Sequence, residues 1–185
     1  MPWSQRGRRF FDLYAHDMCR VVTCVPTVKL GDPLGNAVEI ERLYMSARED
    51  GAAVVLFPEL CVSGYALDDL HQQDAMLDDC LRALARLRRV TRNSGPVLVV
   101  GSPLRASHRL FNCACVFANG DVIGVVPKSY PPNFREFYEL RQFVPADAAV
   151  DTDLDPRDVI GDDDTGLEDD DDDDEAAAQK KKKRG

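Results

Sequence analysis

The chain has 185 residues, of which 44% are hydrophobic, and its formal net charge is −9 at pH 7. Residues 1–150 contain 17 acidic and 17 basic side chains, whereas residues 151–185 contain 15 acidic and 6 basic ones. We therefore expect one neutral globular domain over 1–150, which argues against nucleic-acid binding, and a disordered tail over 151–185 in which an acidic block precedes a basic one.

The first predicted elements are a strand over 20–25 and a helix that begins after Asp32. Asp32 is typical of an N-cap, Pro33 of the first helical position, and Gly51 of a helix end. The apolar run 52–57 then predicts a buried strand. Within the helix, apolar side chains recur at helical spacing at Ala37, Ile40, Leu43, Tyr44 and Ala47.

A second helix is expected to begin at Asp74 and to end at residues 93–96, which read Asn-Ser-Gly-Pro. Its predicted inner stripe consists of Leu77, Cys80, Leu81, Leu84, Leu87 and Val90. Its arginines are expected to face solvent, at positions Arg82, Arg86, Arg88, Arg89 and Arg92.

The rest of the domain is predicted to be mostly strand. Residues 97–100 form one apolar run, and the runs 110–117 and 121–126 are joined by Ala-Asn-Gly at 118–120, which indicates a hairpin. Because strands and helices alternate along the first part of the chain, the sequence predicts an α/β layered fold.

The N-terminus is basic, but Asp12, His16 and Asp17 interrupt the apolar run that a signal peptide needs. No apolar run approaches the length of a membrane span, so we expect a cytoplasmic protein without membrane contact. The cysteines lie in apolar stretches without a CxxC pair, and the histidines are scattered. This pattern favours reduced, buried thiols and predicts no metal site.

Two of the predicted strands end in a proline followed by a charged residue. The run 52–57 leads into Pro58 and Glu59, with Ser-Gly-Tyr at 63–65, and the run 121–126 leads into Pro127 and Lys128. A buried strand that stops there presents its charged residue at the edge of a sheet, where open α/β sheets keep their chemistry. Each charge taken alone is typical of a solvated strand end, and the order and spacing of the pair favour a functional interpretation.

These motifs, together with Arg-Glu-Phe-Tyr-Glu at 135–139, resemble the nitrilase (carbon-nitrogen hydrolase) superfamily. The fuller wording is most similar to the glutaminase domain of glutamine-dependent NAD+ synthetases. The resemblance implies an α-β-β-α sandwich, of which this chain would supply roughly the first half. It also implies glutamine as the small-molecule substrate and a homo-oligomeric protein. ATP and magnesium would belong to a synthetase domain, so no cofactor is expected in this chain.

Amide hydrolysis through a covalent intermediate needs a nucleophile, a base and a positive charge at the developing oxyanion. The resemblance assigns Glu59 as general base and Lys128 as oxyanion stabiliser. It assigns Glu139 as a carboxylate that supports the lysine, for which a surface ion pair is an equal alternative. Tyr65 and Phe134 are expected to bind substrate. The synthetases commonly have tyrosine at position 134, and loss of its hydroxyl would weaken glutamine binding.

The family's nucleophile is a cysteine on a later strand, and no cysteine follows Cys115 in this chain. Cys61 lies two residues beyond Glu59, but a buried packing thiol is the favoured interpretation. We therefore expect a fragment of a glutaminase domain that is inactive as it stands. The alternatives are another nitrilase-type amidase and a non-catalytic remnant or interaction protein, which the missing cysteine and the charged tail would support.

Overall fold

A computed structural model describes residues 12–106, 108–148 and 160 of the chain. The expected disorder of residues 151–185 falls outside the described residues, with Ile160 as the exception. Ile160 is 3% exposed and belongs to the main hydrophobic core. The core therefore includes a residue beyond the expected domain boundary at 150.

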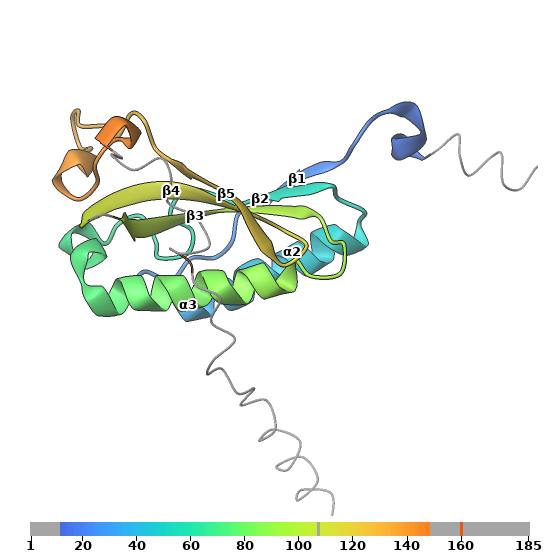
Figure 1. Ribbon diagram of the computed structural model, residues 1–185, viewed down its shortest axis with the longest axis horizontal. Coiled ribbons are helices and arrows are strands. Elements are labelled where there is room, and N and C mark those ends of the chain that lie inside the picture. The colour runs from blue at the N-terminus through green and yellow to red at the C-terminus, as the bar shows by residue number, and fades with distance from the viewer. Residues whose placement is uncertain (1–11, 107, 149–159, 161–185) are drawn as a thin grey trace, which may run out of the picture.

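The stretches 12–106 and 108–148 contain five strands and two α-helices (Figure 1). In chain order they are β1 (Val21–Thr23), α2 (Pro33–Glu49), β2 (Val54–Leu56), α3 (Asp74–Val90), β3 (Val97–Ala106), β4 (Arg109–Ala118) and β5 (Asp121–Pro127). Short 3-10 helices complete the described elements: η1 (Leu13–His16), η2 (Asp68–Gln72), η3 (Glu139–Arg141) and η4 (Ala146–Ala148).

The strands form one sheet in the order β1-β2-β3-β4-β5. The first three are parallel, and β4 and β5 add to β3 as antiparallel neighbours. Both α-helices lie against the same face of this sheet (Figure 1). One helix layer on one sheet is the α-β half of the predicted sandwich, so the α/β fold class is confirmed.

Helix α2 begins and packs as its sequence predicts. The Asp32 side chain accepts a hydrogen bond from the Gly35 amide at 2.9 Å, and Pro33 occupies the first turn. The buried face consists mainly of Ala37, Ile40, Tyr44 and Ala47. Tyr44 is fully buried, and its hydroxyl donates to the Pro96 carbonyl at 2.9 Å, which ties the helix to the start of β3.

Helix α3 buries a wider arc than expected. Its inner stripe is confirmed at Leu77, Cys80, Leu84 and Leu87, but the prediction that Arg88 faces solvent is wrong, because that residue is only 7% exposed. Position 88 lies one helical turn beyond Leu84, and α3 contacts both α2 and the sheet. A helix packed on two sides buries the flank of its apolar stripe as well as the centre.

The strand pair β4–β5 is joined by a two-residue turn, as predicted. Asn119 and Gly120 have φ values of 55° and 82°, the left-handed conformations that a type I′ hairpin requires. Strand β3 is longer than the predicted run 97–100, because it continues through Gly101, Ser102 and Pro103 to pair with the whole of β4. Glycine and proline usually mark strand ends, which explains the short prediction.

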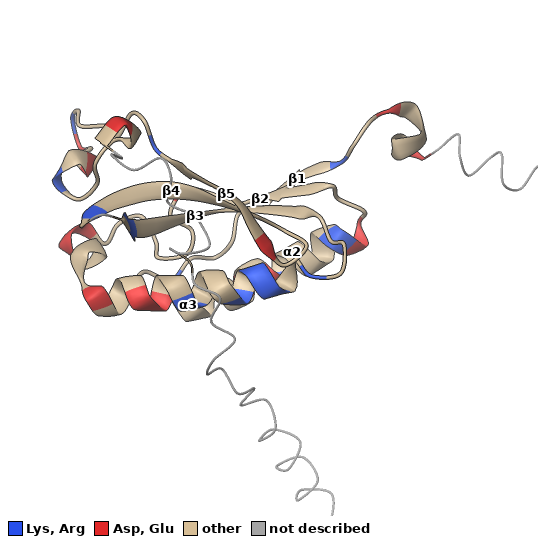
Figure 2. Cartoon of the chain, in the orientation of Figure 1, with Lys and Arg blue, Asp and Glu red and all other residues tan. Residues whose placement is uncertain are grey.

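The two faces of the sheet differ. Alternate strand residues such as Val55, Leu98, Val100 and Cys115 are fully buried on the helix-covered face. On the opposite face, here called the outer face, Leu56 is 41% exposed and Val126 is 60% exposed. Figure 2 shows that charged residues gather on the helices and loops and are sparse on the strands. Within the described residues, no helix is long and apolar enough to cross a membrane.

Candidate functional site

Glu59 is presented by a short excursion of the chain beyond β2. The Phe57 amide donates to the Val99 carbonyl at 2.9 Å, and the Val62 amide donates to the Gly101 carbonyl at 3.1 Å. The two amides are five residues apart in the chain, whereas the two carbonyls that they contact are only two residues apart on β3. Residues 58–61 are therefore more than the sheet needs at this point. The extra residues leave the plane of the sheet and hold Glu59 over the outer face. Leu60 completes the turn with a φ of 49°, an uncommon value for a residue with a side chain.

Gly101 makes room for this excursion. A Cβ atom at this position would lie 2.3 Å from the Leu60 nitrogen, 2.6 Å from the Pro58 oxygen and 2.7 Å from the Glu59 Cα. All three atoms belong to the backbone and cannot move aside as a flexible side chain could. The absence of a side chain at position 101 therefore allows the excursion to lie directly on β3.

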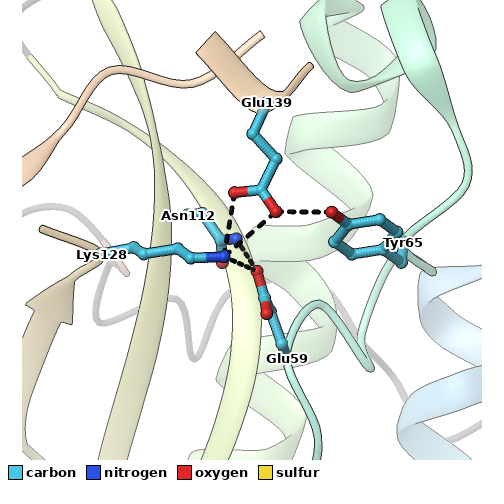
Figure 3. Close-up of polar contacts among 5 residues, drawn as sticks. All are labelled: Glu59, Tyr65, Asn112, Lys128 and Glu139. Carbon is cyan, nitrogen blue, oxygen red and sulfur yellow. Dashed lines mark hydrogen bonds and ion pairs between the residues drawn. The ribbon is translucent and has the colours of Figure 1, made fainter. Parts of the chain in front are cut away.

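Lys128 follows β5 and points toward Glu59 (Figure 3). Its ammonium group lies 2.7 Å from Glu59 Oε1 and 3.0 Å from Glu139 Oε2. Partial burial acts to lower the pKa of Lys128, but the hydrogen bonds and charges of the two carboxylates outweigh it and raise the pKa. The ammonium form is therefore favoured, which suits a group that stabilises negative charge.

Glu139 begins η3, and its side chain is 6% exposed. The backbone fixes its position, because its amide donates to the Pro132 carbonyl at 3.1 Å and its carbonyl accepts from the Phe143 amide at 2.8 Å. Both Glu139 oxygens accept from Lys128. The pair is buried on the glutamate side, so the geometry differs from that of an exposed surface ion pair.

Tyr65 and Asn112 extend the cluster of Glu59, Lys128 and Glu139 at its two ends (Figure 3). The Tyr65 hydroxyl donates to Glu139 Oε1 at 2.5 Å, and burial together with that carboxylate raises the pKa of Tyr65, so the phenol stays protonated. The Asn112 side-chain amide donates to Glu59 Oε1. The five residues therefore form a chain of contacts in the order Asn112, Glu59, Lys128, Glu139 and Tyr65.

A groove of about 580 Å³ lies over this part of the outer face. Apolar residues from β2, β3, β4 and β5 line it, and its charged and polar side chains are those of Glu59, Asn112, Lys128, Ser129 and Tyr130. An open apolar groove with a few convergent polar groups is typical of a small-molecule site. The described residues contain no group of three or more side chains with the arrangement of a metal site.

The structure brings Glu59, Lys128, Glu139 and Tyr65 together and leaves Phe134 apart. The Phe134 ring is 68% exposed, and the Arg135 guanidinium lies over it at 5.0 Å from the ring centroid. The Tyr65 hydroxyl is engaged by Glu139, and the same residue lines a second, smaller cavity of about 120 Å³ beside η3. The substrate-binding roles of Tyr65 and Phe134 stay predictions.

The cysteines of the domain core do not have the properties of a nucleophile. Cys61 is 1% exposed, and burial raises its pKa to about 12. Burial also raises the pKa values of Cys80 and Cys113 to about 12, and that of Cys115 as well. A thiol that ionises only at such high pH supplies almost no thiolate at neutral pH. Cys61 is therefore a packing residue, as the sequence favours.

Two polar residues near the site were not singled out by the sequence. Asn112 is the polar residue of the apolar run 110–117, and a polar side chain inside a buried strand is the signal that could have indicated it. His71 is 1% exposed, its ring packs at a tilt against that of Phe143, and its Nε2 lies 3.2 Å from the Gly64 carbonyl oxygen. It supports the loop that carries Tyr65, and nothing in its sequence context predicts this burial.

The comparisons with known proteins agree on one family. The model of the carbon-nitrogen hydrolase family matches residues 20–159. The glutamine-dependent NAD(+) synthetases of Mycobacterium bovis and Mycobacterium leprae are 46% and 41% identical over 138 residues, which are 75% of this chain and 20% of each relative. The chain therefore spans about a fifth of the length of these relatives.

Two solved structures have a similar fold. The glutamine-dependent NAD(+) synthetase of Cytophaga hutchinsonii aligns with a TM-score of 0.65 and 24% identity over 69% of this chain and 22% of its own. An amidase from Nesterenkonia sp. AN1 aligns with a TM-score of 0.59 and 26% identity over 69% of this chain and 48% of its own. That amidase structure shows covalent addition of the acetamide moiety of fluoroacetamide at an active-site cysteine.

Proposed function

The chain belongs to the carbon-nitrogen hydrolase family, and from this premise we propose that it supplies the base and the oxyanion-stabilising cation of a glutamine amidohydrolase site. The observation that carries the proposal is the position of Lys128, which lines the groove and pairs with both Glu59 and Glu139. The identity of 46% to glutamine-dependent NAD(+) synthetases supports glutamine as the substrate.

Each charged residue has a distinct task in this proposal. Glu59 takes the proton of the nucleophile as the nucleophile attacks the side-chain amide carbon of glutamine. The Lys128 ammonium stabilises the negative charge on the carbonyl oxygen. When the C–N bond breaks, Glu59 returns the proton to the departing nitrogen, and ammonia leaves. Water then hydrolyses the acyl intermediate, again with Glu59 as base. Glu139 holds Lys128 in place throughout.

The nucleophile is proposed to come from sequence outside these 185 residues. The chain contains no cysteine after Cys115, and burial raises the pKa values of Cys61 and Cys113, which disfavours the thiolate that a nucleophile needs. The related amidase, whose chain is about twice as long as the aligned part, reacts through an active-site cysteine. We therefore expect this chain alone to release no ammonia from glutamine.

The ammonia would serve the reaction for which the related glutamine-dependent NAD(+) synthetases are named. We propose that the chain is part of a cytoplasmic protein that uses ammonia from glutamine to amidate deamido-NAD+ with ATP. The residues that bind ATP and magnesium would belong to the four-fifths of the relatives that this chain does not span. A second candidate is an amidase for short aliphatic amides, which the exposed Phe134 in place of a glutamine-binding tyrosine favours.

The test joins residues 1–150 to the downstream, cysteine-containing half of a related glutaminase domain and measures ammonia release. Glutamine should be hydrolysed by this chimera and not by the 185-residue chain. Lys128→Ala should lower turnover by on the order of a hundredfold or more, and Glu59→Gln should abolish it. Phe134→Tyr should improve glutamine binding. A folded chimera whose turnover ignores both Glu59→Gln and Lys128→Ala would refute the proposed site, and a preference for acetamide over glutamine would favour the second candidate.

A further inference from the structure

Asn112 contacts two of the three charged residues of the site, Glu59 and Lys128. Its side-chain amide donates to Glu59 Oε1, and its backbone carbonyl accepts from the Lys128 amide at 2.8 Å. Asn112 is 4% exposed and lies on β4, paired with Pro103 of β3. A rigid strand in the middle of the sheet therefore fixes the distance between the excursion that carries Glu59 and the residue that follows β5.

The contacts of Asn112 also distinguish the two oxygens of Glu59. Asn112 and Lys128 both donate to Oε1. Among the residues that the structure describes, no hydrogen bond reaches Oε2. The Glu59 side chain is 42% exposed and lines the groove. Fixing Oε1 from two directions leaves Oε2, the other oxygen of this partly exposed carboxylate, with free lone pairs.

We propose that Asn112 is a positioning residue that holds Glu59 against Lys128 and selects Oε2 as the oxygen that exchanges a proton in the reaction. The catalytic part of this inference rests on the proposed function, and the positional part does not. A side-chain amide suits the task, because it donates a hydrogen bond at every pH at which the protein is folded and never competes for the proton. A carboxylate or imidazole at this position would titrate.

The positional part is tested on the 185-residue chain itself, through the pKa of the Lys128 ammonium measured by NMR titration. Glu59→Gln removes one of the two carboxylate partners of Lys128 and should lower this pKa by about 1 pH unit. If Asn112 holds Glu59 in place, Asn112→Leu should lower the pKa by at least half as much. Added to Glu59→Gln, Asn112→Leu should have no further effect, because the two act through the same contact.

Asn112→Ala provides a second variant with less demand on packing, and thermal unfolding of each variant checks that it is folded. A pKa of Lys128 that stays at its wild-type value in both folded Asn112 variants would overturn the proposal. So would an effect of Asn112→Leu that adds in full to that of Glu59→Gln.

The catalytic part is tested in the chimera with a nucleophile. Asn112→Leu should lower kcat about tenfold or more and leave KM within about twofold, because a positioning residue for the base does not touch glutamine. A raised KM with unchanged kcat would overturn this part. If the unmodified chimera hydrolyses no glutamine, the proposed function fails, and the NMR titration still decides whether Asn112 positions Glu59.

Discussion

Lys128 shares its ammonium between two carboxylates in different environments. The Glu59 side chain is 42% exposed, whereas the Glu139 side chain is 6% exposed. Glu139 must keep its hydrogen bonds, because a buried carboxylate without partners is costly. Glu59 lines the groove, is partly exposed and can exchange one contact for another. The same lysine therefore joins one buried carboxylate to one that solvent reaches.

The first prediction concerns stability at alkaline pH. The pKa of Lys128 is raised above its ordinary value of 10.5, so the folded state holds this proton more tightly than the unfolded state does. The stabilisation is then complete below about pH 10.5 and is lost as the pH rises through the folded-state pKa. Tyr65, whose pKa is also raised, acts in the same direction.

Glu139→Gln should remove the part of this stabilisation, and of its pH dependence, that comes from the contact of Lys128 with Glu139, while Glu59 stays paired with the lysine. In urea unfolding at pH 8, the wild-type chain should exceed the variant by about 2 kcal/mol, because the variant loses the buried carboxylate that Lys128 and Tyr65 contact. At pH 11 the difference should shrink. An equal difference at both pH values would show that the contacts do not depend on the charge of Lys128.

The second prediction concerns the thiols. With pKa values of about 12, Cys61 and Cys113 are ionised in about one molecule in ten thousand at pH 8, and both are buried. Titration of the folded chain with a disulfide reagent should label the exposed Cys19 quickly and these two only after unfolding. In urea all six cysteines should react. Rapid labelling of Cys61 in the folded chain would contradict its assignment as a packing residue.

At this scale, the sequence predicted the residues that carry a motif and missed those that support them. Glu59 and Lys128 could be found because each ends an apolar run, and Glu139 because it completes the segment 135–139. Asn112 has only the weaker signal of a polar side chain inside an apolar run, and His71 has none. Their importance comes from contacts with residues far along the chain, such as the 53 residues that separate Asn112 from Glu59.

Among the secondary-structure elements, the excursion over residues 58–61 is the one that creates the site. Strand β2 and strand β5 are not neighbours, since β3 and β4 lie between them. Glu59 nevertheless reaches Lys128, because the excursion crosses the outer face at Gly101 and Lys128 approaches from the other side of β4. The site is therefore built on the face of the sheet as well as at the strand ends.

The third prediction tests this dependence on Gly101. Gly101→Ala places a Cβ atom within 2.7 Å of three backbone atoms of the excursion, so either the excursion or β3 must shift. The expected loss is about 2 kcal/mol or more in the free energy of unfolding, with weaker pairing of Lys128 to Glu59 seen as a lower pKa of Lys128.

Gly124→Ala is the matched control, because Gly124 lies on β5 and a Cβ atom there meets nothing within 4 Å. This variant should unfold within about 0.5 kcal/mol of the wild-type chain and leave the Lys128 pKa unchanged. Equal effects of the two substitutions would show that Gly101 matters only as a glycine in a strand.

The regular elements followed from the sequence wherever local signals agreed. The start of α2 at Asp32 and the turn at Asn119 and Gly120 needed only local chemistry. The second half of β3 and the burial of Arg88 did not follow, because both depend on a neighbour. Strand β3 continues because β4 pairs with it, and Arg88 is covered because α3 packs on two sides.

At the scale of the whole molecule, the described residues form two layers with one apolar face left open. The helices cover one side of the sheet (Figure 1), and the outer face exposes Leu56 and Val126 around the groove. The relatives are longer, with 48% of the Nesterenkonia amidase aligned to this chain. Exposed apolar patches of more than a few hundred Å² promote association.

The last prediction follows from this open face. Residues 1–150 expressed alone should associate or bind a hydrophobic dye, and the acidic tail should improve solubility through its charge. Val126→Lys should reduce dye binding and leave the thermal unfolding temperature within about 2 °C of that of the unsubstituted protein, because the side chain is 60% exposed on the outer face.

Val125→Lys is the matched control on the same strand. Its side chain packs against the core on the helix-covered face, so this substitution should lower the unfolding temperature by about 5 °C or more and should not reduce dye binding. A monomer of residues 1–150 with a sharp unfolding transition and no dye binding would show that the outer face is already covered within the chain.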